Sequence, residues 1–168
     1  KSFCKDLLVK QRIPTARAGS FTEVEKALAF LESLTCPIVV KADGLAGGKG
    51  VVIAPSRKEA GQAIREMMEA RVFGEAGTRV LVEEFLVGEE LSLHAVTDGK
   101  NLVLLPSAQD HKRVGEGDTG LNTGGMGAYA PAPRATPELL GEVEEKILRP
   151  TLAGLNQLGI DYRGVLYA

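Results

Sequence analysis

The chain has 168 residues, of which 44% are hydrophobic and 25% are charged, a composition typical of a globular protein with one domain or two small lobes. Its net charge of -2 argues against a nucleic-acid-binding surface, because such surfaces carry a basic excess. No apolar run approaches the roughly 18 residues of a membrane helix and no signal-like segment opens the chain, so we expect a cytoplasmic protein without membrane contacts.

The first predicted elements are two helices separated by an extended segment. Residues 2–11, "SFCKDLLVKQ", predict a short helix, and Pro14 then turns the chain into a brief extended stretch. Thr22 and Glu25 have the spacing of a capping box, which predicts a second helix that ends near Leu34.

A glycine-rich loop follows between two apolar runs, "PIVVKA" and "GVVIA", which predict a β-hairpin. The loop fits neither the P-loop nor the G-x-G-x-x-G pattern, because its glycines and Lys49 have the wrong spacing. A glycine hairpin can fold its backbone N–H groups over a polyphosphate, and it can equally be a surface turn without a ligand. Lys41, at the end of the first strand, would either bind a phosphate or extend into solvent.

The next predicted elements complete a compact α+β lobe. Ser56 and Glu59 repeat the capping-box spacing and open a helix whose inward side is apolar. The core residues expected on that side are Ala60, Ala63, Ile64, Met67 and Met68. Residues 79–86, "RVLVEEFL", then predict a strand, so the lobe has the order strand, helix, hairpin, helix, strand.

Beyond Gly88 the pattern indicates another hairpin, then an irregular stretch and a helix. Asp98 and Gly99 lie between two apolar runs, which predicts a type I′ turn. Residues 106–135 show little periodicity, and their content favours a functional segment over a disordered one. A helix is expected from Thr136 to about Gly159, bent or broken at Pro150.

The chain ends and the cysteines complete this description. The chain begins at Lys1 without a methionine and ends in the apolar run "GVLYA", which predicts a buried strand, so we expect a piece of a longer protein. Cys4 and Cys36 follow no disulfide or metal-ligand spacing, and we expect them to be buried free thiols.

Two further stretches carry groups suited to ligand binding. Glu90 precedes a predicted strand and can accept two hydrogen bonds from a ribose diol, although a solvated acid is the plainer interpretation. The segment "QDHKRVGEGDTGLNTGGMGAYAPAP" combines clustered charges with a glycine-rich run, which suits an anionic polar substrate. A solvated basic loop and an RNA contact are alternatives, and Glu116, Asp118 and the lack of interleaved aromatic residues weaken the second.

Taken in order, four segments of the chain resemble the ATP-grasp ligases, and within them the phosphoribosylamine-glycine ligase family of purine biosynthesis. The segments are "KADGLAGGKG", "VEEFLVGEE", "SAQDHKRVGEGDTGLNTGGMGAYAP" and "GVLYA". The first is shared broadly among ATP-grasp enzymes, whereas "QDHKR" with "NTGGMGAYAP" is much more specific, and the likeness covers essentially the whole chain.

The resemblance implies an α+β ATP-grasp fold. Residues 15–87 would form the small lobe with the glycine-rich hairpin as a nucleotide lid, and residues 1–14 with 88–168 an incomplete part of the larger lobe. The implied reaction is ATP-dependent ligation of glycine to 5-phosphoribosylamine through a glycyl phosphate, which forms a C–N bond and releases ADP and phosphate.

The resemblance also implies a set of site residues. Lys5 and Lys41 would contact ATP phosphates, residues 47–50 would close over them, Glu83 and nearby backbone groups would face adenine, and Glu90 would hold the ribose. The full nucleotide set is Lys5, Lys41, Gly47, Gly48, Lys49, Gly50, Glu83, Glu84, Phe85, Leu86 and Glu90. The substrate set is Asp110, His111, Lys112, Arg113, Asn122, Thr123, Gly124, Gly125, Met126 and Gly127, with Lys41, Lys112 and Arg113 as catalytic residues.

The implied cofactors are ATP and Mg²⁺ or Mn²⁺, and the implied partners are the small-molecule substrates and the remainder of the parent chain. None of the metal ligands is expected within residues 1–168, because the Glu-Phe-Asn segment that follows "GVLYAG" in relatives does not occur here. Two alternatives remain, namely another ATP-grasp ligase that joins a carboxylate to an amine or a thiol, and a nucleotide-binding module without chemistry.

Overall fold

The computed structural model describes residues 1–47, 49–117 and 119–168, without the side chains of Leu121 and Asn122. Contacts divide the chain into two compact units, one of residues 1–6 and 15–87 and the other of residues 7–14 and 88–168. The expected division assigned all of residues 1–14 to the second unit. The difference arises in helix α1 (Ser2–Lys10), whose first residues contact the first unit.

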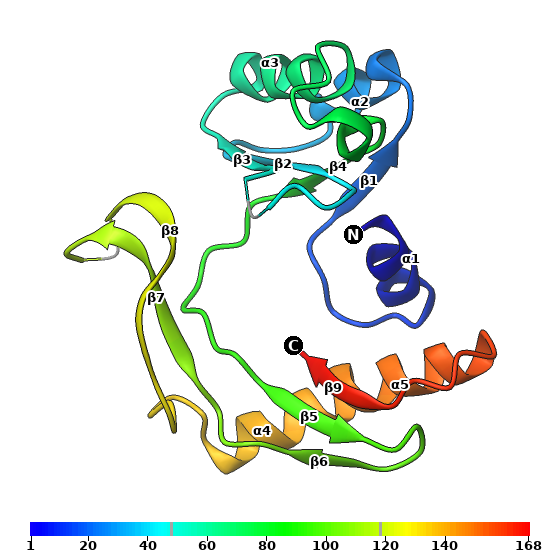
Figure 1. Cartoon of the computed structure of the whole chain (residues 1–168), viewed down its shortest axis with the longest axis vertical. Helices are drawn as coiled ribbons and strands as arrows, with labels where there is room; N and C mark the ends of the chain where they lie inside the picture. Colours follow the sequence, from blue (N-terminus) through cyan, green and yellow to red (C-terminus); the bar gives the residue numbers. More distant parts are fainter. Residues whose placement is uncertain (48, 118) are drawn as a thin grey trace. The chain divides into compact units, whose positions relative to one another are not determined.

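The first unit is a four-stranded antiparallel sheet with helices on one face. The strand order is β1-β4-β2-β3, and helices α2 and α3 cover one side of the sheet (Figure 1). The strands are β1 (Ala18–Phe21), β2 (Ile38–Ala42), β3 (Val51–Ala54) and β4 (Val80–Glu84). The helices are α2 (Val24–Leu31), α3 (Arg57–Met68) and a short 3-10 helix (Gly74–Gly77). The predicted order of strand, helix, hairpin, helix, strand is confirmed.

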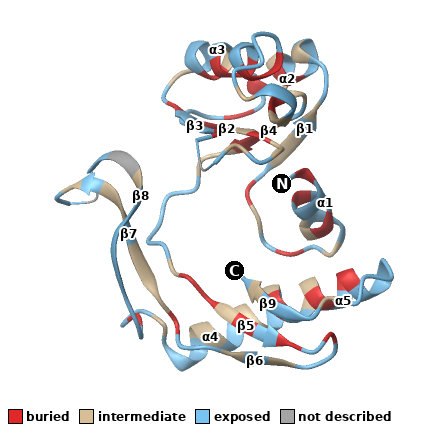
Figure 2. Cartoon of the chain, viewed as in Figure 1, coloured by how far each residue is buried: buried red, intermediate tan, exposed pale blue. Residues whose placement is uncertain are grey.

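Alternation along the strands places the core between the sheet and the helices. Ile38, Val40, Val80 and Val82 share one face because successive side chains of a strand point to opposite sides. They pack with the apolar side of α3, whose buried residues are the five predicted ones, Ala60, Ala63, Ile64, Met67 and Met68. Figure 2 shows the buried residues of both helices on the side that faces the sheet.

The two predicted helix caps have different outcomes. Ser56 caps α3, because its hydroxyl accepts a hydrogen bond from the Glu59 amide. The Thr22 prediction was wrong, since α2 begins after Glu23, whose side chain makes no capping hydrogen bond. The Glu23 carboxylate accepts a hydrogen bond from Lys26 at 2.6 Å instead.

The second unit contains a three-stranded sheet, a separate hairpin and an irregular helix (Figure 1). The sheet has the order β6-β5-β9 and is antiparallel throughout. Its strands are β5 (His94–Thr97), β6 (Leu102–Leu104) and β9 (Gly164–Tyr167), and the hairpin is formed by β7 (Gln109–Gly115) and β8 (Thr119–Tyr129). The final strand was predicted and its position is confirmed, but the expectation that it is buried was wrong, because three of its four residues are exposed.

The long helix of this unit continues through Pro150 and is irregular just before it. It consists of α4 (Pro137–Val143), one π-helical turn (Glu144–Leu148) and α5 (Arg149–Gln157). The Arg149 amide bonds back five residues to the Glu144 carbonyl, so the chain absorbs the missing N–H of Pro150 without stopping. The last turn of α1 packs closely on α5, because a Cβ at Gly154 would lie 2.6 Å from the Gln11 side chain.

The hairpin of β5 and β6 was predicted correctly, but the predicted type I′ turn was wrong. Thr97 pairs with Leu102, so the loop has four residues and is not a two-residue type I′ turn. The Asp98 carboxylate organises this loop, because one of its oxygens accepts the amides of Lys100 at 2.9 Å and Asn101 at 2.6 Å. A side chain thus supplies the acceptor that a tight turn would take from the backbone.

This carboxylate is expected to make the stability of the protein depend on pH. Hydrogen bonds from the Asn101 amide and side chain and from the Lys100 amide lower the pKa of Asp98 from 3.8 to about 2. A lowered folded-state pKa stabilises the fold above pH 3.8, and that contribution is lost as the pH falls through about 2. The difference in unfolding free energy between the wild type and Asp98→Ala should therefore shrink with falling pH. Urea unfolding at several pH values measures it, and a difference independent of pH would contradict the assignment.

Residues 106–135 are more regular than expected. They contain β7 and β8, which pair along most of their length with register shifts between His111 and Arg113 and between Arg113 and Gly115.

The expectation of buried thiols was wrong, because both Cys4 and Cys36 are exposed.

None of the helices within the described ranges combines the length and apolar composition needed to cross a membrane.

Candidate functional site

The glycine loop connects β2 to β3 in the first unit. The Ala42 amide donates to the Gly50 carbonyl at 2.8 Å, which closes the base of the loop. Gly50 fits there because it has no side chain, since a Cβ would lie 2.6 Å from that of Ala46. Gly47 has a φ of +57°, a conformation that glycine adopts at little cost. Lys49 is exposed, and Gly48 lies outside the described residues.

Three charged residues of the nucleotide set meet on the sheet face opposite the core. Glu83 of β4 and Lys41 of β2 lie on this face, and Lys5 reaches it from α1. Glu83 Oε1 lies 3.0 Å from Lys5 Nζ, and Glu83 Oε2 forms an ion pair with Lys41 Nζ. The structure therefore brings together residues from three distant parts of the sequence.

The environment of Glu83 favours its ionised form. Burial raises the pKa of this carboxyl, but the hydrogen bonds and positive charges of Lys41 and Lys5 outweigh burial and lower the pKa below its ordinary value. The cluster therefore holds two ammonium groups and one carboxylate, which leaves an excess of one positive charge.

Two contacts at this cluster had no signal in the sequence. Lys1 Nζ donates to the carbonyls of Ala42 at 2.6 Å and Gly44 at 2.8 Å, which places another ammonium group at the start of the glycine loop. Thr15 Oγ1 accepts a hydrogen bond from Lys5 Nζ at 2.6 Å. Both contacts join residues far apart in the chain, where no local spacing indicates them.

The remaining nucleotide-set residues at the end of β4 differ in their surroundings. Glu84 fastens the strand to the start of β1, because its carboxylate accepts the Arg17 amide at 2.8 Å and its own amide donates to the Arg17 carbonyl at 2.9 Å. Phe85 is half-buried and Leu86 is exposed beyond the end of the strand. Their backbone groups directly follow the last residue of β4.

In the second unit, the two halves of the substrate set are partners in one hairpin. Asp110 pairs with Ala128, His111 with Gly127, and Arg113 with Asn122, so residues 110–113 lie alongside residues 122–127. Thr123 Oγ1 donates to the Lys112 carbonyl at 2.9 Å and accepts the Gly125 amide at 3.0 Å. Gly124, Met126 and Gly127 are exposed, and the Asn122 side chain lies outside the described residues.

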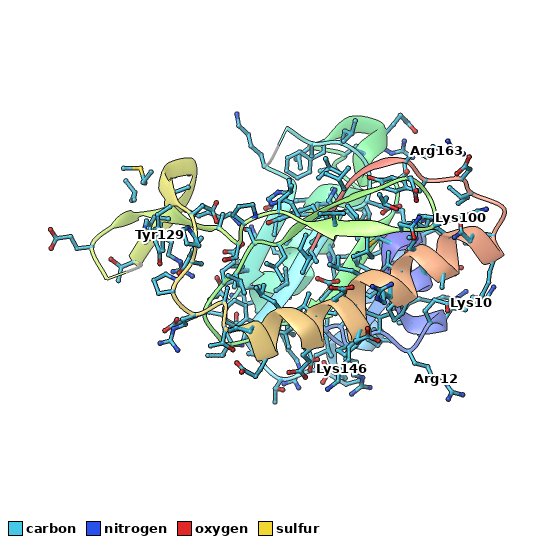
Figure 3. The ribbon with its side chains drawn as sticks, turned by 90° about the horizontal axis from the view of Figure 1, so that it is seen from below. Lys10, Arg12, Lys100, Tyr129, Lys146 and Arg163 are labelled. Carbon is cyan, nitrogen blue, oxygen red and sulfur yellow. The ribbon has the colours of Figure 1, made fainter. Side chains whose placement is uncertain are left out.

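Aromatic side chains support the base of this hairpin. The rings of His111 and Tyr129 lie 5.6 Å apart between centroids, and the Tyr129 hydroxyl donates to the Gln109 side chain. Figure 3 labels Tyr129, whose side chain lies at the hairpin.

Lys112 joins this hairpin to Glu90. Its ammonium group forms an ion pair with Glu90 and lies 3.7 Å from Asp110 Oδ1. The hydrogen bond to Glu90 raises the pKa of Lys112, against the opposing effect of partial burial, so this lysine is charged at neutral pH. Asp110 Oδ1 is itself buried, and among the residues that the structure describes it has no hydrogen-bond partner. The arrangement collects hydrogen-bonding and charged groups suited to an anionic or amine-bearing ligand.

Metal-ligating side chains are not clustered in this part of the protein. Within residues 1–47, 49–117 and 119–168, no group of three or more His, Cys, Asp or Glu side chains is placed to hold a metal ion.

Comparison with solved structures defines the class of fold. A crystal structure of phosphoribosylamine–glycine ligase from Thermotoga maritima superposes with a TM-score of 0.90 at 37% identity, over 99% of this chain and 42% of that one. Carboxyaminoimidazole ribonucleotide synthase from Aspergillus clavatus, solved in complex with ATP, is similar in fold, with a TM-score of 0.68 at 20% identity over 99% and 39% of the two chains. The chain has the α+β ATP-grasp fold expected from its sequence.

Sequence comparison defines the family. The model of the phosphoribosylglycinamide synthetase ATP-grasp (A) domain matches residues 1–168, and the chain belongs to this family. It is 55% identical to phosphoribosylamine–glycine ligase of Haemophilus influenzae over its whole length, which is 39% of that relative. The chain thus spans about 40% of the length of the curated relatives it matches.

Proposed function

We infer that this chain is part of a longer enzyme that ligates glycine to 5-phosphoribosylamine with ATP in de novo purine biosynthesis. The observation that carries this inference is the family match over residues 1–168, which includes both substrate segments. The reaction would transfer the ATP γ-phosphoryl group to the glycine carboxylate, and the amine would then displace phosphate from the glycyl phosphate. The products are glycinamide ribonucleotide, ADP and phosphate.

The first unit would act as the small ATP-grasp lobe and hold the nucleotide. Lys41 lies near the point where β2 enters the glycine loop, and its ammonium group would neutralise phosphate charge. Residues 47–50 would close over the phosphates, with Lys49 as a mobile second cation. The end of β4, including Phe85 and Leu86, would present backbone groups to the adenine. Phosphoryl transfer requires such positioning more than covalent chemistry from the protein.

The second unit would contribute the incomplete larger lobe and the substrate hairpin. Lys112 and Arg113 would bind the phosphate or carboxylate of the substrates, since cations form strong hydrogen bonds with both groups. Further contacts with the substrates would come from the side chains of Asp110 and His111 and from the exposed glycine amides within residues 122–127. Glu90 forms an ion pair with Lys112, so ribose binding at Glu90 would compete with that ion pair.

The proposed cofactors are ATP and Mg²⁺ or Mn²⁺, with the metal held by residues of the longer protein. When bound, it would supply neutralisation of the charge that develops during phosphoryl transfer. The proposed partners are the three small-molecule substrates and the remainder of the protein, and the proposed location is the cytoplasm.

A phosphate-release assay on a full-length protein that contains these 168 residues tests the proposal. Release is expected when ATP, glycine, phosphoribosylamine and magnesium are all present, and omission of any one should abolish it. Release with a different carboxylate or amine in place of these substrates would assign another ATP-grasp ligase activity. ATP binding without release under any pairing would indicate a nucleotide-binding module.

The ribose assignment predicts a selective effect of Glu90→Gln. The variant is expected to bind ATP roughly tenfold more weakly, because a carboxylate accepts stronger hydrogen bonds from the ribose hydroxyls than an amide does. Tripolyphosphate, which has no ribose, should bind as before. Competition titrations with both ligands measure this, with Glu89→Gln at the neighbouring exposed acid as the control. Equal losses for both ligands would mean that Glu90 acts through folding.

A further inference from the structure

The buried position of Glu83 is unusual for a residue that is expected to contact a ligand. Its side chain is 7% exposed, and its two carboxylate oxygens are each engaged by a different lysine. A direct hydrogen bond from adenine would have to reach a carboxylate that is already enclosed and paired. The geometry therefore favours contacts within the protein over contacts with a ligand.

Lys5 is also fully engaged. Its ammonium group has three hydrogens, and it has three acceptors nearby, namely Glu83 Oε1 at 3.0 Å, Thr15 Oγ1 at 2.6 Å and the Ala16 carbonyl at 3.0 Å. Its side chain is 11% exposed. A phosphate could bind Lys5 only by displacing one of these acceptors, of which Glu83 and Ala16 are buried and Thr15 is half-buried, and the displaced group would lose its partner.

Lys41 differs from Lys5 in its exposure and in the partners of its ammonium group. Its side chain is 30% exposed, and in the described part of the chain Glu83 is the partner that the structure assigns to its ammonium group. Hydrogens of Lys41 are therefore available to an anionic ligand that approaches from solvent. The two lysines share one carboxylate, but Lys41 is more exposed to solvent than Lys5.

The geometry points to a positioning role for Lys5 and Glu83, in which Lys5 anchors the buried Glu83 carboxylate and Glu83 holds the Lys41 ammonium group in place for the phosphates of a nucleoside triphosphate. This inference rests on the proposed function and refines it, because Lys5 and Glu83 then serve the nucleotide through Lys41. The excess positive charge of the cluster remains on the exposed side, where the phosphates arrive. The lowered pKa of Glu83 agrees with this arrangement, since only the ionised carboxylate holds both lysines.

Binding of tripolyphosphate and of ATP to the full-length protein separates positioning from direct contact. If Glu83 positions Lys41, Glu83→Gln should weaken both ligands by about the same factor, about tenfold, which is within the range of coupling between side chains in contact. Weakening of ATP alone would show that Glu83 contacts the adenine and would overturn the inference. Isothermal titration of the two ligands measures both affinities.

A double-mutant cycle with Lys41→Ala distinguishes positioning from a general structural role. In the Lys41→Ala background, Glu83→Gln should change the affinity for tripolyphosphate by less than about twofold, because the group that it positions is gone. In the Glu83→Gln background, Lys5→Met should likewise have little further effect. Full effects of Glu83→Gln in the absence of Lys41 would overturn the inference.

Folding and function can be separated in the same experiment. The double variant Lys5→Met/Glu83→Gln removes both buried charges together and leaves the partly exposed Lys41 ammonium group without its carboxylate, so it remains testable if a single variant unfolds. It is expected to unfold at a urea concentration near that of the wild type and to bind tripolyphosphate about tenfold more weakly. Wild-type affinity in this folded variant would overturn the inference. A wild-type protein that binds neither ATP nor tripolyphosphate would overturn the proposed function and this inference with it.

Discussion

Replacement of Lys41 by alanine in the full-length protein is expected to weaken ATP binding roughly 10- to 150-fold. A hydrogen bond between a charged lysine and a phosphate contributes about 1.5–3 kcal/mol, and each 1.4 kcal/mol corresponds to about tenfold in affinity. Lys41 is the partly exposed member of the cluster with Glu83, so we expect its loss to remove a cation that the phosphates would contact. Nucleotide titration of the variant measures the loss.

Lys49→Ala provides the comparison for this variant. Lys49 lies in the exposed part of the glycine loop, so its removal should affect binding less and turnover more than removal of Lys41. Unchanged ATP affinity in Lys41→Ala would exclude the phosphate assignment. A Lys49→Ala variant that loses more affinity than Lys41→Ala would reverse the order of importance of the two cations.

Ile64→Ala is expected to destabilise the fold by about 2–5 kcal/mol, the usual range for truncation of a large buried aliphatic side chain. Ile64 is 0% exposed on α3, within the cluster that joins the two helices to the sheet. Truncation leaves a cavity there because strands β2 and β4 and helix α2 enclose the site and relax only in part. Urea unfolding of the two proteins gives the difference in free energy.

Lys58→Ala on the same helix is the matched control. Lys58 is exposed, and alanine has a good helix propensity, so the change should remain within about 0.5 kcal/mol. A loss of less than about 1 kcal/mol for Ile64→Ala would show that α3 contributes little to the stability of this unit.

The sequence predicted the elements of the first unit well because each of them carries a strong local signal. The α3 helix has both a capping serine and an apolar side of period 3.6, and the strands at residues 38–42 and 80–84 are runs of β-branched and apolar residues. The Thr22 cap failed because a capping-box spacing alone does not decide where a helix begins. The backbone of Glu23 adopts the extended capping conformation instead.

The hairpin of β7 and β8 was missed for a different reason. Its strands contain five glycines, which carry no apolar alternation, and two register shifts interrupt the period of two on which strand prediction depends. The pairing of residues 110–113 with 122–127 is therefore visible only in the structure. The two sequence segments were grouped by their charged and glycine-rich content and by the resemblance, without any prediction that they form partner strands.

The charged cluster of Lys5, Lys41 and Glu83 shows how much of the candidate site could be predicted from the sequence. Lys41 was singled out from its position before the glycine loop, and Lys5 and Glu83 were named from the resemblance. Their mutual ion pairs depend on strand order and on the position of α1, which no local pattern encodes. The roles of these residues in binding ATP stay predictions. The exposure of Cys4 and Cys36 was likewise a tertiary property without a local signal.

The π-helical turn before Pro150 affects where in the long helix the protein can tolerate a change of chain length. A π turn closes its hydrogen bond over five residues instead of four, so Glu144–Leu148 takes up one residue more than an α-helical turn would. Deletion of one residue there could be absorbed by a return to the α-helical pattern. The same deletion within α5 would rotate the buried Leu152 and Leu155 by about 100° relative to the preceding turns, because a helix has 3.6 residues per turn. The long helix therefore contains one place where chain length can vary without turning its leucines away from the core.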